Sequence, residues 1–495
     1  MRDERRTMAA GARADMNVTA PWSGVERRLL AAVAAATLFF VCITPPFQAP
    51  DENQHYLRAL WLAQGHVIAQ KQGESVGAVL PRSATALIAQ DFPVDVAPVI
   101  RLFDHDQIAQ ANLADAGRGG VAFAEFPNVA SYAPTLYLPD ALGLWVGEAT
   151  GLSRLSAFYL ARVCNALIGL GLLMGALCLL PFGRHAMLAV AMLPTFAYQT
   201  GSLSPDAVIN GLGFLGLAIA LRISFMGGEP MRTAGLFATA PLLALAKGVY
   251  LPLMAAGLRW PTGRSDRRPW LILAAMAAGA AVFLLWMRYS GGTQVLYYVM
   301  SRKTGEHLLT APLADQLVIV VRDPAAFVHI LATSIAERMP TYIVQIVGRF
   351  GWNAIMLPLL AYPLAGLMLM AGVLSGSGVR ASVGQRLWWM AVALGVALLI
   401  EIAMYLTATP LGADYVQGTQ GRYFLPVLPL ALLALAPDRG WRAAPMVVAG
   451  SALLLLSVAM ASAFDAFWVH GFVTDDGMPP LTDTGRALFL PSPRW

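Results

Sequence analysis

Apolar segments recur along the whole chain, and they constrain its fold more than any other feature. They lie at about 29–44, 157–180, 186–203, 207–226, 232–247, 249–260, 270–288, 353–375, 386–408, 422–437 and 443–463. A helix needs about 20 mostly apolar residues to cross a bilayer, and so many segments exceed what one soluble core can bury. Because only 13% of the 495 residues are charged, we expect an all-α polytopic membrane protein with about 11 transmembrane helices.

Arginines give the orientation, because cytoplasmic loops of membrane proteins hold an excess of Lys and Arg. They fall at Arg2, Arg5, Arg6, Arg13, Arg27 and Arg28 and in the later turns at Arg184, Arg222, Arg232, Arg259, Arg267, Arg268, Arg380, Arg386, Arg439 and Arg442. About 11 crossings put all of these turns on one side. The net charge of +5 therefore reflects topology, and we expect no nucleic-acid partner. Pro50 follows the only plausible signal-cleavage point, Ala49, so the first span should stay uncleaved.

This orientation divides the chain into one transmembrane domain, 29–463, a cytoplasmic N-terminal tail, 1–28, and an outer C-terminal tail, 464–495. Two long segments, about 46–156 and 289–352, face outward. Their amphipathic patterns and their Trp and Tyr residues predict helices that rest on the membrane surface. Within the first, residues 132–151 are amphipathic enough either to cross or to lie in the interface. The interfacial placement is favoured, because a crossing here would move every later arginine-rich turn to the outer side of the membrane.

The motif "PDENQHYLRALW" at 50–61 places two adjacent acids just outside the first apolar segment. If a helix begins near Pro50, then Asp51, His55 and Arg58 share one face. One carboxylate there is explained by helix capping. Capping needs only one acid, however, and Asp51 with Glu52 beside it and His55 nearby offers a general base and a second group for substrate.

The motif "SLSPDAVINGLGFL" at 202–215 presents the same choice. Ser204, Pro205 and Asp206 match the residues preferred at the first positions of a helix, so capping alone explains the acid. Topology nevertheless places Asp206 on the same outer face as Asp51 and Glu52, which favours a functional role.

Two cations accompany these acids. Lys247 in "LLALAKGVYLPL" lies inside an apolar segment, where an ammonium is costly and needs a lipid phosphate or a carboxylate as partner; we expect it at the outer apex of a helix broken within 232–258. In "VQGTQGRYFLPVLPL", a glycine-rich loop presents Gln420, Arg422 and Tyr423, and the guanidinium offers a fork for phosphate. The alternative for Arg422 and Tyr423 is an interfacial anchor.

Several chemistries find no support in the sequence. We see no phosphate-loop motif, no paired-cysteine metal motif and no HExxH, so soluble-nucleotide chemistry is not indicated. Cys42, Cys164 and Cys178 all lie in apolar segments and are expected to be packing residues. Glu401 also lies in an apolar segment, and a structural ion pair with an arginine from another helix explains it as well as a functional role does. The remaining acids and cations suit a reaction in which a hydroxyl is deprotonated while a lipid phosphate leaves.

A set of short motifs carries a family resemblance. "APDENQH", "YAPTLYLPDALG", "SLSPDAVINGLGFL", "ALAKGVYLPL", "VGRFGWNAIMLP" and "QGRYFLP", in this order, resemble a bacterial integral-membrane family, domain of unknown function 2142, over about 30–440. That family looks like a branch of the GT-C superfamily of membrane glycosyltransferases, which take a sugar from a polyprenyl-phosphate carrier on the outer side of the membrane. The resemblance implies a long first periplasmic loop with interfacial helices in a bacterial inner-membrane protein.

The resemblance also implies roles for the residues above. The acidic motif of the first loop would carry the catalytic base, Asp51 with Glu52 adjacent, and a second outer acid would be Asp206. The basic residues that hold the carrier phosphate map onto Lys247 and Arg422. We further expect His55, Gln420 and Tyr423 to contact substrate; no metal-ligand set is assigned, although Asp51 and Asp206 leave a shared divalent cation open.

We therefore expect an inverting glycosyltransferase that moves a sugar from a polyprenyl-phosphate donor to an envelope glycan, lipid or protein acceptor at the periplasmic face. One alternative is a transporter or flippase of a lipid-linked sugar, for which the broken helix at Lys247 and Glu401 would form the substrate or coupling site. Another is a glycan polymerase or ligase acting on a pyrophosphate carrier.

Overall fold

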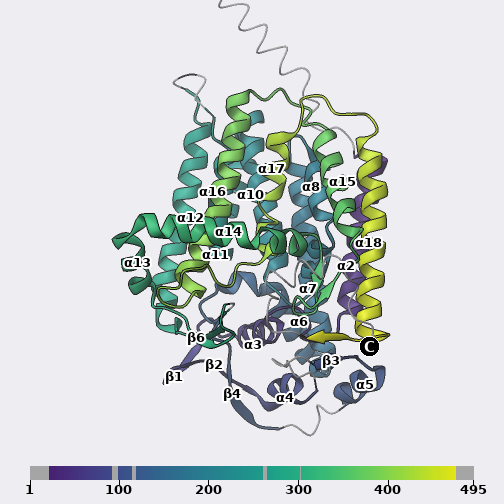
Figure 1. Ribbon diagram of the computed structural model, residues 1–495, viewed down its shortest axis with the longest axis vertical. Coiled ribbons are helices and arrows are strands. Elements are labelled where there is room, and N and C mark those ends of the chain that lie inside the picture. The colour runs from purple at the N-terminus through teal and green to yellow at the C-terminus, as the bar shows by residue number, and fades with distance from the viewer. Residues whose placement is uncertain are drawn as a thin grey trace, which may run out of the picture.

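A bundle of upright helices forms most of the molecule (Figure 1). The computed structural model describes residues 22–91, 99–113, 119–259, 263, 265–301 and 303–474. The helices of the bundle are α2 (Gly24–Ile43), α7 (Arg154–Leu179), α8 (Arg184–Ala191), α9 (Pro194–Thr200), α10 (Asp206–Met226), α11 (Pro230–Ala246), η4 (Gly248–Gly257), α12 (Arg268–Ser290), α15 (Ala361–Leu374), α16 (Val383–Ala408), α17 (Leu428–Leu435) and α18 (Ala444–Trp468). The prediction of a mostly helical chain is confirmed.

Five of the described helices, α7, α10, α12, α16 and α18, are long and apolar enough to cross a membrane. A sixth span is counted if α13 (Leu313–Arg322) and α14 (Pro324–Val347), which bend by 106° at their junction, are taken together. The expected first crossing, α2, is an unbroken helix of 20 residues that is not among these five. The expected crossing at 186–203 is interrupted, because α8 ends at Ala191 and Pro194 begins α9. The structure therefore supports five or six spans by length, and about 11 crossings stays a prediction.

The expected break near Lys247 is present. Helix α11 ends at Ala246, and Lys247 takes an extended conformation (φ −164°, ψ 107°) before the tighter 3-10 turns of η4 begin. Pro241 lies within α11 and Pro252 within η4. Since proline lacks the amide hydrogen of a regular helix, both segments are poorly suited to form one continuous helix.

The first long outer segment is not purely helical, which corrects the all-α prediction. It contains helices α3 (Glu52–Ala63), α4 (Arg82–Ala86), α5 (His105–Leu113) and α6 (Leu138–Ala149) and an antiparallel sheet of β1 (Gln70–Gln72), β2 (Ser75–Pro81) and β4 (Val121–Glu125). In β2, Val76, Ala78 and Leu80 are buried at alternate positions, which is the period of a strand. Gly77 is needed there, because a Cβ would lie 1.9 Å from the carbonyl oxygen of Ala124.

This sheet and α3, which packs against β2, lie together at the lower end of the bundle in Figure 1. We call it the sheet end. Strand β3 (Val99–Arg101) pairs there with β9 (Phe472–Thr474), so the segment after α18 returns to the first outer segment. The rest of the C-terminal tail, 475–495, and residues 1–21 of the N-terminal tail lie outside the described residues.

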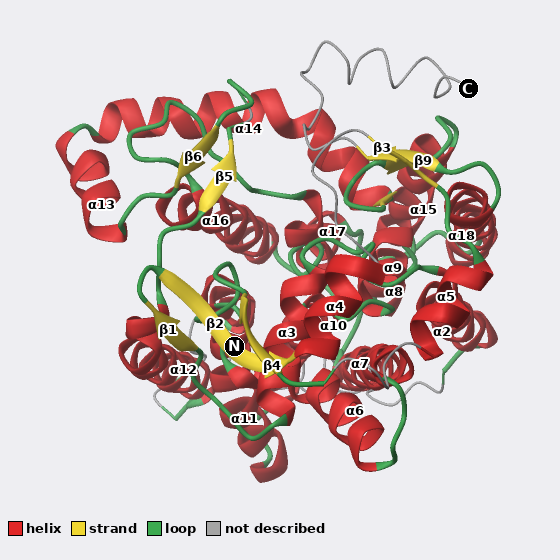
Figure 2. Ribbon diagram, turned by 90° about the horizontal axis from the view of Figure 1, so that it is seen from below, coloured by secondary structure: helices red, strands yellow, loops and turns green. Residues whose placement is uncertain are grey.

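The second outer segment also lies partly across the bundle. After a short hairpin of β5 (Tyr298–Met300) and β6 (His307–Leu309), α13 turns sharply into α14, and β7 (Arg349–Phe350) pairs with β8 (Ile355–Met356). Seen from the sheet end, α14 runs lengthwise along one side while the upright helices appear end-on (Figure 2). This orientation agrees with helices that rest on a membrane surface.

Residues 132–151 form no full crossing. They comprise the 3-10 turn η3 (Pro134–Leu136) and α6, whose 12 residues extend over about 18 Å, less than a bilayer core. Helix α6 packs closely on α7, because Gly143 and Gly147 face Ala161 and Ala157. Small residues four apart on both helices let their backbones approach. The predicted interfacial placement is therefore favoured over a crossing.

We expect Gly143→Ala to destabilise the protein by about 1–3 kcal/mol, because the added Cβ overpacks the α6–α7 contact, where it would lie 2.5 Å from the Cα of Ala161. Gly171→Ala in α7 is the matched control, since nothing lies within 4 Å of its Cβ and alanine favours a helix. Thermal unfolding of the purified variants measures both. Equal melting temperatures for the two variants would contradict this contact.

Candidate active site at the start of helix α3

The loop between α2 and α3 is held in place by side chains from distant helices. Arg162 of α7 donates hydrogen bonds to the carbonyl oxygens of Thr44 (2.5 Å) and Pro45 (3.1 Å). The Tyr198 hydroxyl of α9 donates to the carbonyl of Gln48 at 2.7 Å. Trp352 donates its indole N–H to the carbonyl of Phe47 at 2.8 Å. The loop therefore has little freedom, and Asp51 at its end is fixed with it.

Asp51 has a backbone conformation that is unusual for its residue type. Its φ of 61° and ψ of 9° lie in the left-handed region, which costs a non-glycine residue about 1–3 kcal/mol and is often found at functional sites. Asp51 occupies the N-cap position of α3, yet its side chain makes no capping hydrogen bond. The capping explanation for this acid is therefore wrong, and the carboxylate is left to face other partners.

Those partners include Arg422, which lies between two acids. Its Nη2 is 3.5 Å from Oδ2 of Asp51, and its Nε is 3.1 Å from Oδ2 of Asp206. The exposed fractions of the three side chains are 7% for Arg422, 12% for Asp206 and 29% for Asp51. The structure thus brings together three residues from widely separated motifs, and the most accessible of them is Asp51.

Asp206 reaches this position as the first residue of α10. Ser204 Oγ accepts a hydrogen bond from the Asp206 amide at 3.3 Å, and Asn165 of α7 donates to the carbonyls of Ser202 and Ser204. The N-cap residue of α10 is Pro205, and Oδ2 of Asp206 accepts no hydrogen bond from the described residues. The helix thus begins one residue later than predicted, with Pro205 and not Ser204 at the N-cap position, and the Asp206 carboxylate pairs with Arg422.

Glycine explains how Arg422 fits between the acids. Gly421 begins the short 3-10 turn η6 (Gly421–Phe424), where a Cβ would lie 2.4 Å from the carbonyl oxygen of Tyr342 in α14. Its amide donates to Gln345 Oε1 at 2.7 Å. The turn η6, which contains Arg422, therefore lies directly on α14. Beside it, the Gln420 side-chain oxygen is buried and has no hydrogen-bond partner among the described residues.

Lys247 joins the cluster from the break between α11 and η4. Its Nζ lies 3.9 Å from the ring centroid of Tyr423, a cation–π geometry. Tyr250 donates its hydroxyl to the Tyr423 carbonyl at 2.7 Å, which fixes this turn. Asp206 and Asp51 act electrostatically on the ammonium, but in the described part of the chain no carboxylate forms an ion pair with it. Its charge is therefore less fully matched than that of Arg422.

Glu52 occupies a different environment from Asp51. It is fully buried and forms a two-point ion pair with Arg162, at 2.8 and 2.7 Å. It also accepts a hydrogen bond from the Leu203 amide at 2.8 Å. Both carboxylate oxygens are thus engaged away from solvent, which argues against the predicted catalytic role of Glu52. The structure gives it a positional role instead.

His55 lies one turn further along α3 and is also buried. Its Nδ1 is 2.9 Å from the hydroxyl of Tyr137. Burial and the positive charges of Arg422 and Lys247 lower the pKa of His55 to about 3, so the imidazole is neutral at physiological pH. A neutral imidazole is able to accept or donate a hydrogen bond here, but it carries no charge for binding an anion.

Opposing effects act on the carboxyl group of Asp51. Burial raises its pKa above the ordinary value, the charge of Arg422 lowers it, and the nearby Asp206 raises it again; the net direction is upward. A carboxylate with a raised pKa is a stronger base than an ordinary aspartate. This shift arises where the backbone is strained and the side chain is partly open, a combination that favours a functional site.

A divalent cation shared by Asp51 and Asp206 fits this arrangement poorly, because Arg422 lies between the two carboxylates. Among the residues that the structure describes, no group of three or more His, Cys, Asp and Glu is placed to hold a metal.

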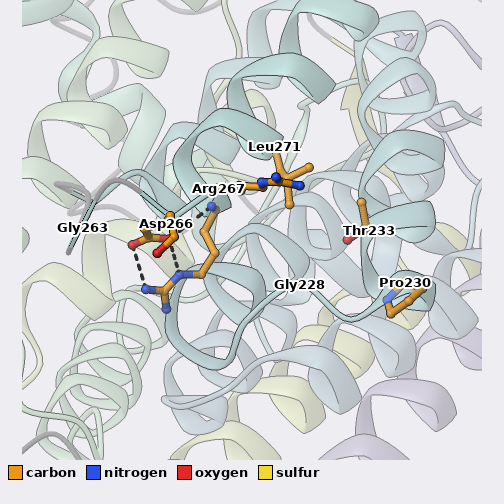
Figure 3. Close-up of a pocket in the computed structure, with 9 residues that line it drawn as sticks. Gly228, Pro230, Thr233, Gly263, Asp266, Arg267 and Leu271 are labelled. Carbon is orange, nitrogen blue, oxygen red and sulfur yellow. Dashed lines mark hydrogen bonds and ion pairs between the residues drawn. The ribbon is translucent and has the colours of Figure 1, made fainter. Parts of the chain in front are cut away.

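An open depression of about 680 Å³ lies at the opposite end of the bundle and is distinct from this cluster. It is lined by Gly228, Thr233 and residues 265–268 (Figure 3). The 21 residues of α10 separate this end from Asp206 by about 30 Å. Asp266 and Arg268 form a two-point ion pair there, so these two charges already pair with each other.

Sequence reasoning missed Arg162, which holds both the loop and Glu52. An arginine inside an apolar segment is itself a signal that a partner exists, so "YLARVCNALIG" offered the clue. It also missed Tyr132 and Tyr297, on whose phenols the charge of Asp51 acts. Glu401 accepts a hydrogen bond from Thr419 at 3.0 Å, and Arg338 of α14 donates to the carbonyl of the same threonine at 3.4 Å.

Comparison with known proteins gives one match. The family model described as "Predicted membrane protein (DUF2142)" matches residues 35–431. No curated protein matches the chain significantly, and no solved structure does so either. The matched residues include all members of the charge cluster, Asp51, Asp206, Lys247 and Arg422.

We expect Glu52→Ala to destabilise the protein by about 3–5 kcal/mol, because it leaves Arg162 charged, buried and without its carboxylate. Glu148→Ala is the control: Glu148 pairs with Arg154 but is 47% exposed, and such surface pairs contribute less than about 1 kcal/mol. Unfolding measured by heat or denaturant compares the two variants. Equal small losses would show that the Glu52–Arg162 pair does not hold the loop.

Proposed function

The chain belongs to the family described as "Predicted membrane protein (DUF2142)", a description that assigns no reaction, and we propose that it is a membrane glycosyltransferase of GT-C type. It transfers a sugar from a polyprenyl-phosphate donor to an acceptor hydroxyl of an envelope glycan, lipid or protein. The observation that carries this proposal is the cluster in which Arg422 pairs with Asp51 and Asp206, beside Lys247. It combines a base with cations suited to phosphate.

Asp51 acts as the general base in this proposal. Its carboxylate takes the proton of the acceptor hydroxyl as that oxygen attacks the anomeric carbon of the donor. The bond from the anomeric carbon to the phosphate oxygen breaks, and the polyprenyl phosphate leaves with the bonding electrons. One direct displacement inverts the configuration at the anomeric carbon. The upward pKa shift of Asp51 supports this role, as does its being the most accessible acid of the cluster.

Lys247 and Arg422 stabilise the charge that develops on the leaving phosphate. Lys247 has no ion-pair partner among the described residues and offers its three hydrogens. Two nitrogens of Arg422 face carboxylates, whereas its Nη1 is buried and has no hydrogen-bond partner in the described part of the chain. A phosphate oxygen would satisfy that N–H group. Asp206 holds Arg422 in place for this contact.

The membrane orientation belongs to the same proposal. We place the sheet end, and with it the charge cluster, on the periplasmic side of a bacterial inner membrane. The described arginine-rich turns lie at the other end, as Arg222, Arg232 and Arg268 show at the termini of α10, α11 and α12. Positive residues of membrane proteins gather on the cytoplasmic side.

Cysteine labelling tests this orientation. Cys42 and Cys178 are exposed and are first replaced by alanine. We expect a cysteine at Glu74, in the exposed turn between β1 and β2, to react in intact cells with a membrane-impermeant maleimide. A cysteine at Arg439, in the exposed turn before α18, should react only after permeabilisation. The reverse pattern would invert the proposed topology.

The reaction is tested with purified protein in proteoliposomes that contain a panel of polyprenyl-phosphate sugars labelled in the sugar. We expect Asp51→Asn to reduce transfer by about 10²–10⁴-fold, the usual contribution of a general base. Asp104→Asn is the control, because Asp104 is an exposed acid of the same outer segment. Undiminished transfer by the Asp51 variant removes it as the base, and movement of the carrier without transfer would favour the flippase alternative.

The pH dependence gives an independent measure. Because a base must be deprotonated, kcat/KM falls as pH drops through the pKa of Asp51. We expect this acid limb above about pH 4, where an ordinary aspartate titrates, since the pKa of Asp51 is raised. Arg422→Gln removes a charge that lowers this pKa, so its acid limb should move to still higher pH. A shift to lower pH would contradict the pairing.

A further inference from the structure

The depression at the end of the bundle opposite the charge cluster has no part in the proposed reaction. We propose that it binds the phosphate headgroup of an anionic phospholipid in the leaflet that meets this end of the bundle. With the orientation proposed above, that is the cytoplasmic leaflet. The space in the depression, the hydrogen-bond donors that line it and its level in the membrane all suit this ligand.

The depression lies where the first turns of α11 and α12 meet. Thr233 of α11 lies across from Asp266 and Arg267, which precede α12 (Figure 3). The volume of about 680 Å³ lies within the range of about 300–1,000 Å³ that is usual for ligand sites. A Cβ on Gly228 would lie 3.2 Å from Thr233 Oγ1 and 3.3 Å from Leu271 Cδ1. The lack of a side chain at this glycine therefore leaves space between the two helices.

Three side chains of the lining offer hydrogen-bond donors that are not in use. The guanidinium of Arg267 and the hydroxyls of Thr233 and Ser265 form no hydrogen bond or ion pair within the part of the chain that the structure describes. None of the three residues is buried, so each side chain is accessible to a ligand. Phosphate oxygens accept hydrogen bonds from both kinds of group, and a guanidinium offers them two parallel N–H groups.

The acid of the lining does not neutralise Arg267. Asp266 accepts hydrogen bonds from Nε and Nη2 of Arg268 at 2.8 Å each, and Nη1 of Arg268 donates to the Ser224 carbonyl at 3.0 Å. The Asp266 side chain is only 9% exposed, and its charge is balanced by Arg268. Arg267 therefore leaves the described lining with a net charge of +1, which favours an anion.

The surroundings of the depression favour a lipid over a soluble anion. Helix α12 begins at Arg268 and is one of the apolar helices long enough to cross a membrane. In the first turns beside the depression, Trp270 of α12 is 66% exposed and Met231 of α11 is 86% exposed. Exposed tryptophans are typical of the level at which headgroups meet acyl chains.

A lipid would also use the apolar surface that continues from the depression. Only four of the 23 residues of α12 are buried, so most of this helix is open to acyl chains. Basic pockets between transmembrane helices on the cytoplasmic side bind anionic headgroups in this way. A soluble anion would contact the same arginine but would gain nothing from this surface.

Native mass spectrometry of the purified, delipidated full chain in detergent tests the site. The chain is titrated with phosphatidylglycerol, with phosphatidylcholine of the same acyl chains and with glycerol 3-phosphate. We expect phosphatidylglycerol to bind at least about tenfold more tightly than phosphatidylcholine, because its headgroup has a net negative charge. Glycerol 3-phosphate should bind at least about 100-fold more weakly than phosphatidylglycerol, because it buries no acyl chain.

Two variants locate the binding. Arg267→Gln should weaken phosphatidylglycerol binding about fivefold, the effect of one arginine near an anionic headgroup. Thr233→Val keeps the shape of the side chain and should also cost about fivefold, the effect of one hydrogen bond. Arg439→Gln is the matched control, because Arg439 is an exposed arginine of another turn that does not line the depression. It makes the same change in net charge and should leave the affinity unchanged.

Thermal unfolding checks that each variant is folded. Equal affinities for phosphatidylglycerol and phosphatidylcholine, or equal losses in Arg267→Gln and Arg439→Gln, would overturn the proposal. Glycerol 3-phosphate bound as tightly as phosphatidylglycerol would overturn it in favour of a soluble anion. Sugar transfer plays no part in these measurements, so the lipid site and the proposed reaction stand or fall separately.

Discussion

The buried ion pair between Glu52 and Arg162 is the constraint on which the site depends. Arg162 also donates hydrogen bonds to the carbonyls of residues 41, 44 and 45. Its guanidinium therefore joins α7 to the end of α2 and to the start of α3. Glu52 also accepts the amide of Leu203, which leads into α10. The helix that begins after Asp51 and the helix that begins with Asp206 are therefore positioned by the same pair of side chains. An ion pair without exposure to solvent tolerates no missing partner.

Because this ion pair fixes the start of α3, the adjacent acids Asp51 and Glu52 have different roles. The left-handed backbone at Asp51 turns its side chain away from the helix it precedes, toward Arg422, while Glu52 points inward. His55 and Arg58 continue the pattern, because they contact Tyr137 and the backbone of Tyr132. The motif "PDENQHYLR" thus supplies one partly exposed acid and three buried anchors. Most of the charged and polar residues of this motif therefore hold the structure together, and only Asp51 is placed to react.

Much of this arrangement could be predicted from the sequence. The apolar segments predicted a mostly helical chain, and the arginine-rich turn after 258 required a break near Lys247, which the structure contains. The expectation that acids and cations of distant motifs would meet rested on topology, and Arg422 does lie between Asp51 and Asp206. The roles of Lys247, Gln420 and Tyr423 in binding substrate stay predictions.

Other features could not be predicted, for physical reasons. Which of two neighbouring acids points outward depends on one backbone angle at Asp51 that no pattern encodes. The sheet of β1, β2 and β4 was mistaken for surface helices because β1 has only three residues and because β2 pairs with β4, which is about 40 residues away in the sequence. Tyr132 and Tyr297 could not be distinguished from the many tyrosines expected at a membrane boundary.

The order of the chain has a consequence for biosynthesis. Asp51 leaves the ribosome near the beginning of synthesis and Asp206 before its midpoint, whereas Arg422 follows only after nearly all of the helices. A chain that stops short of Gly421 therefore has both acids and Lys247 but lacks the guanidinium that pairs with Asp51 and Asp206 in the finished protein. The charges of the cluster are balanced only when synthesis is nearly complete.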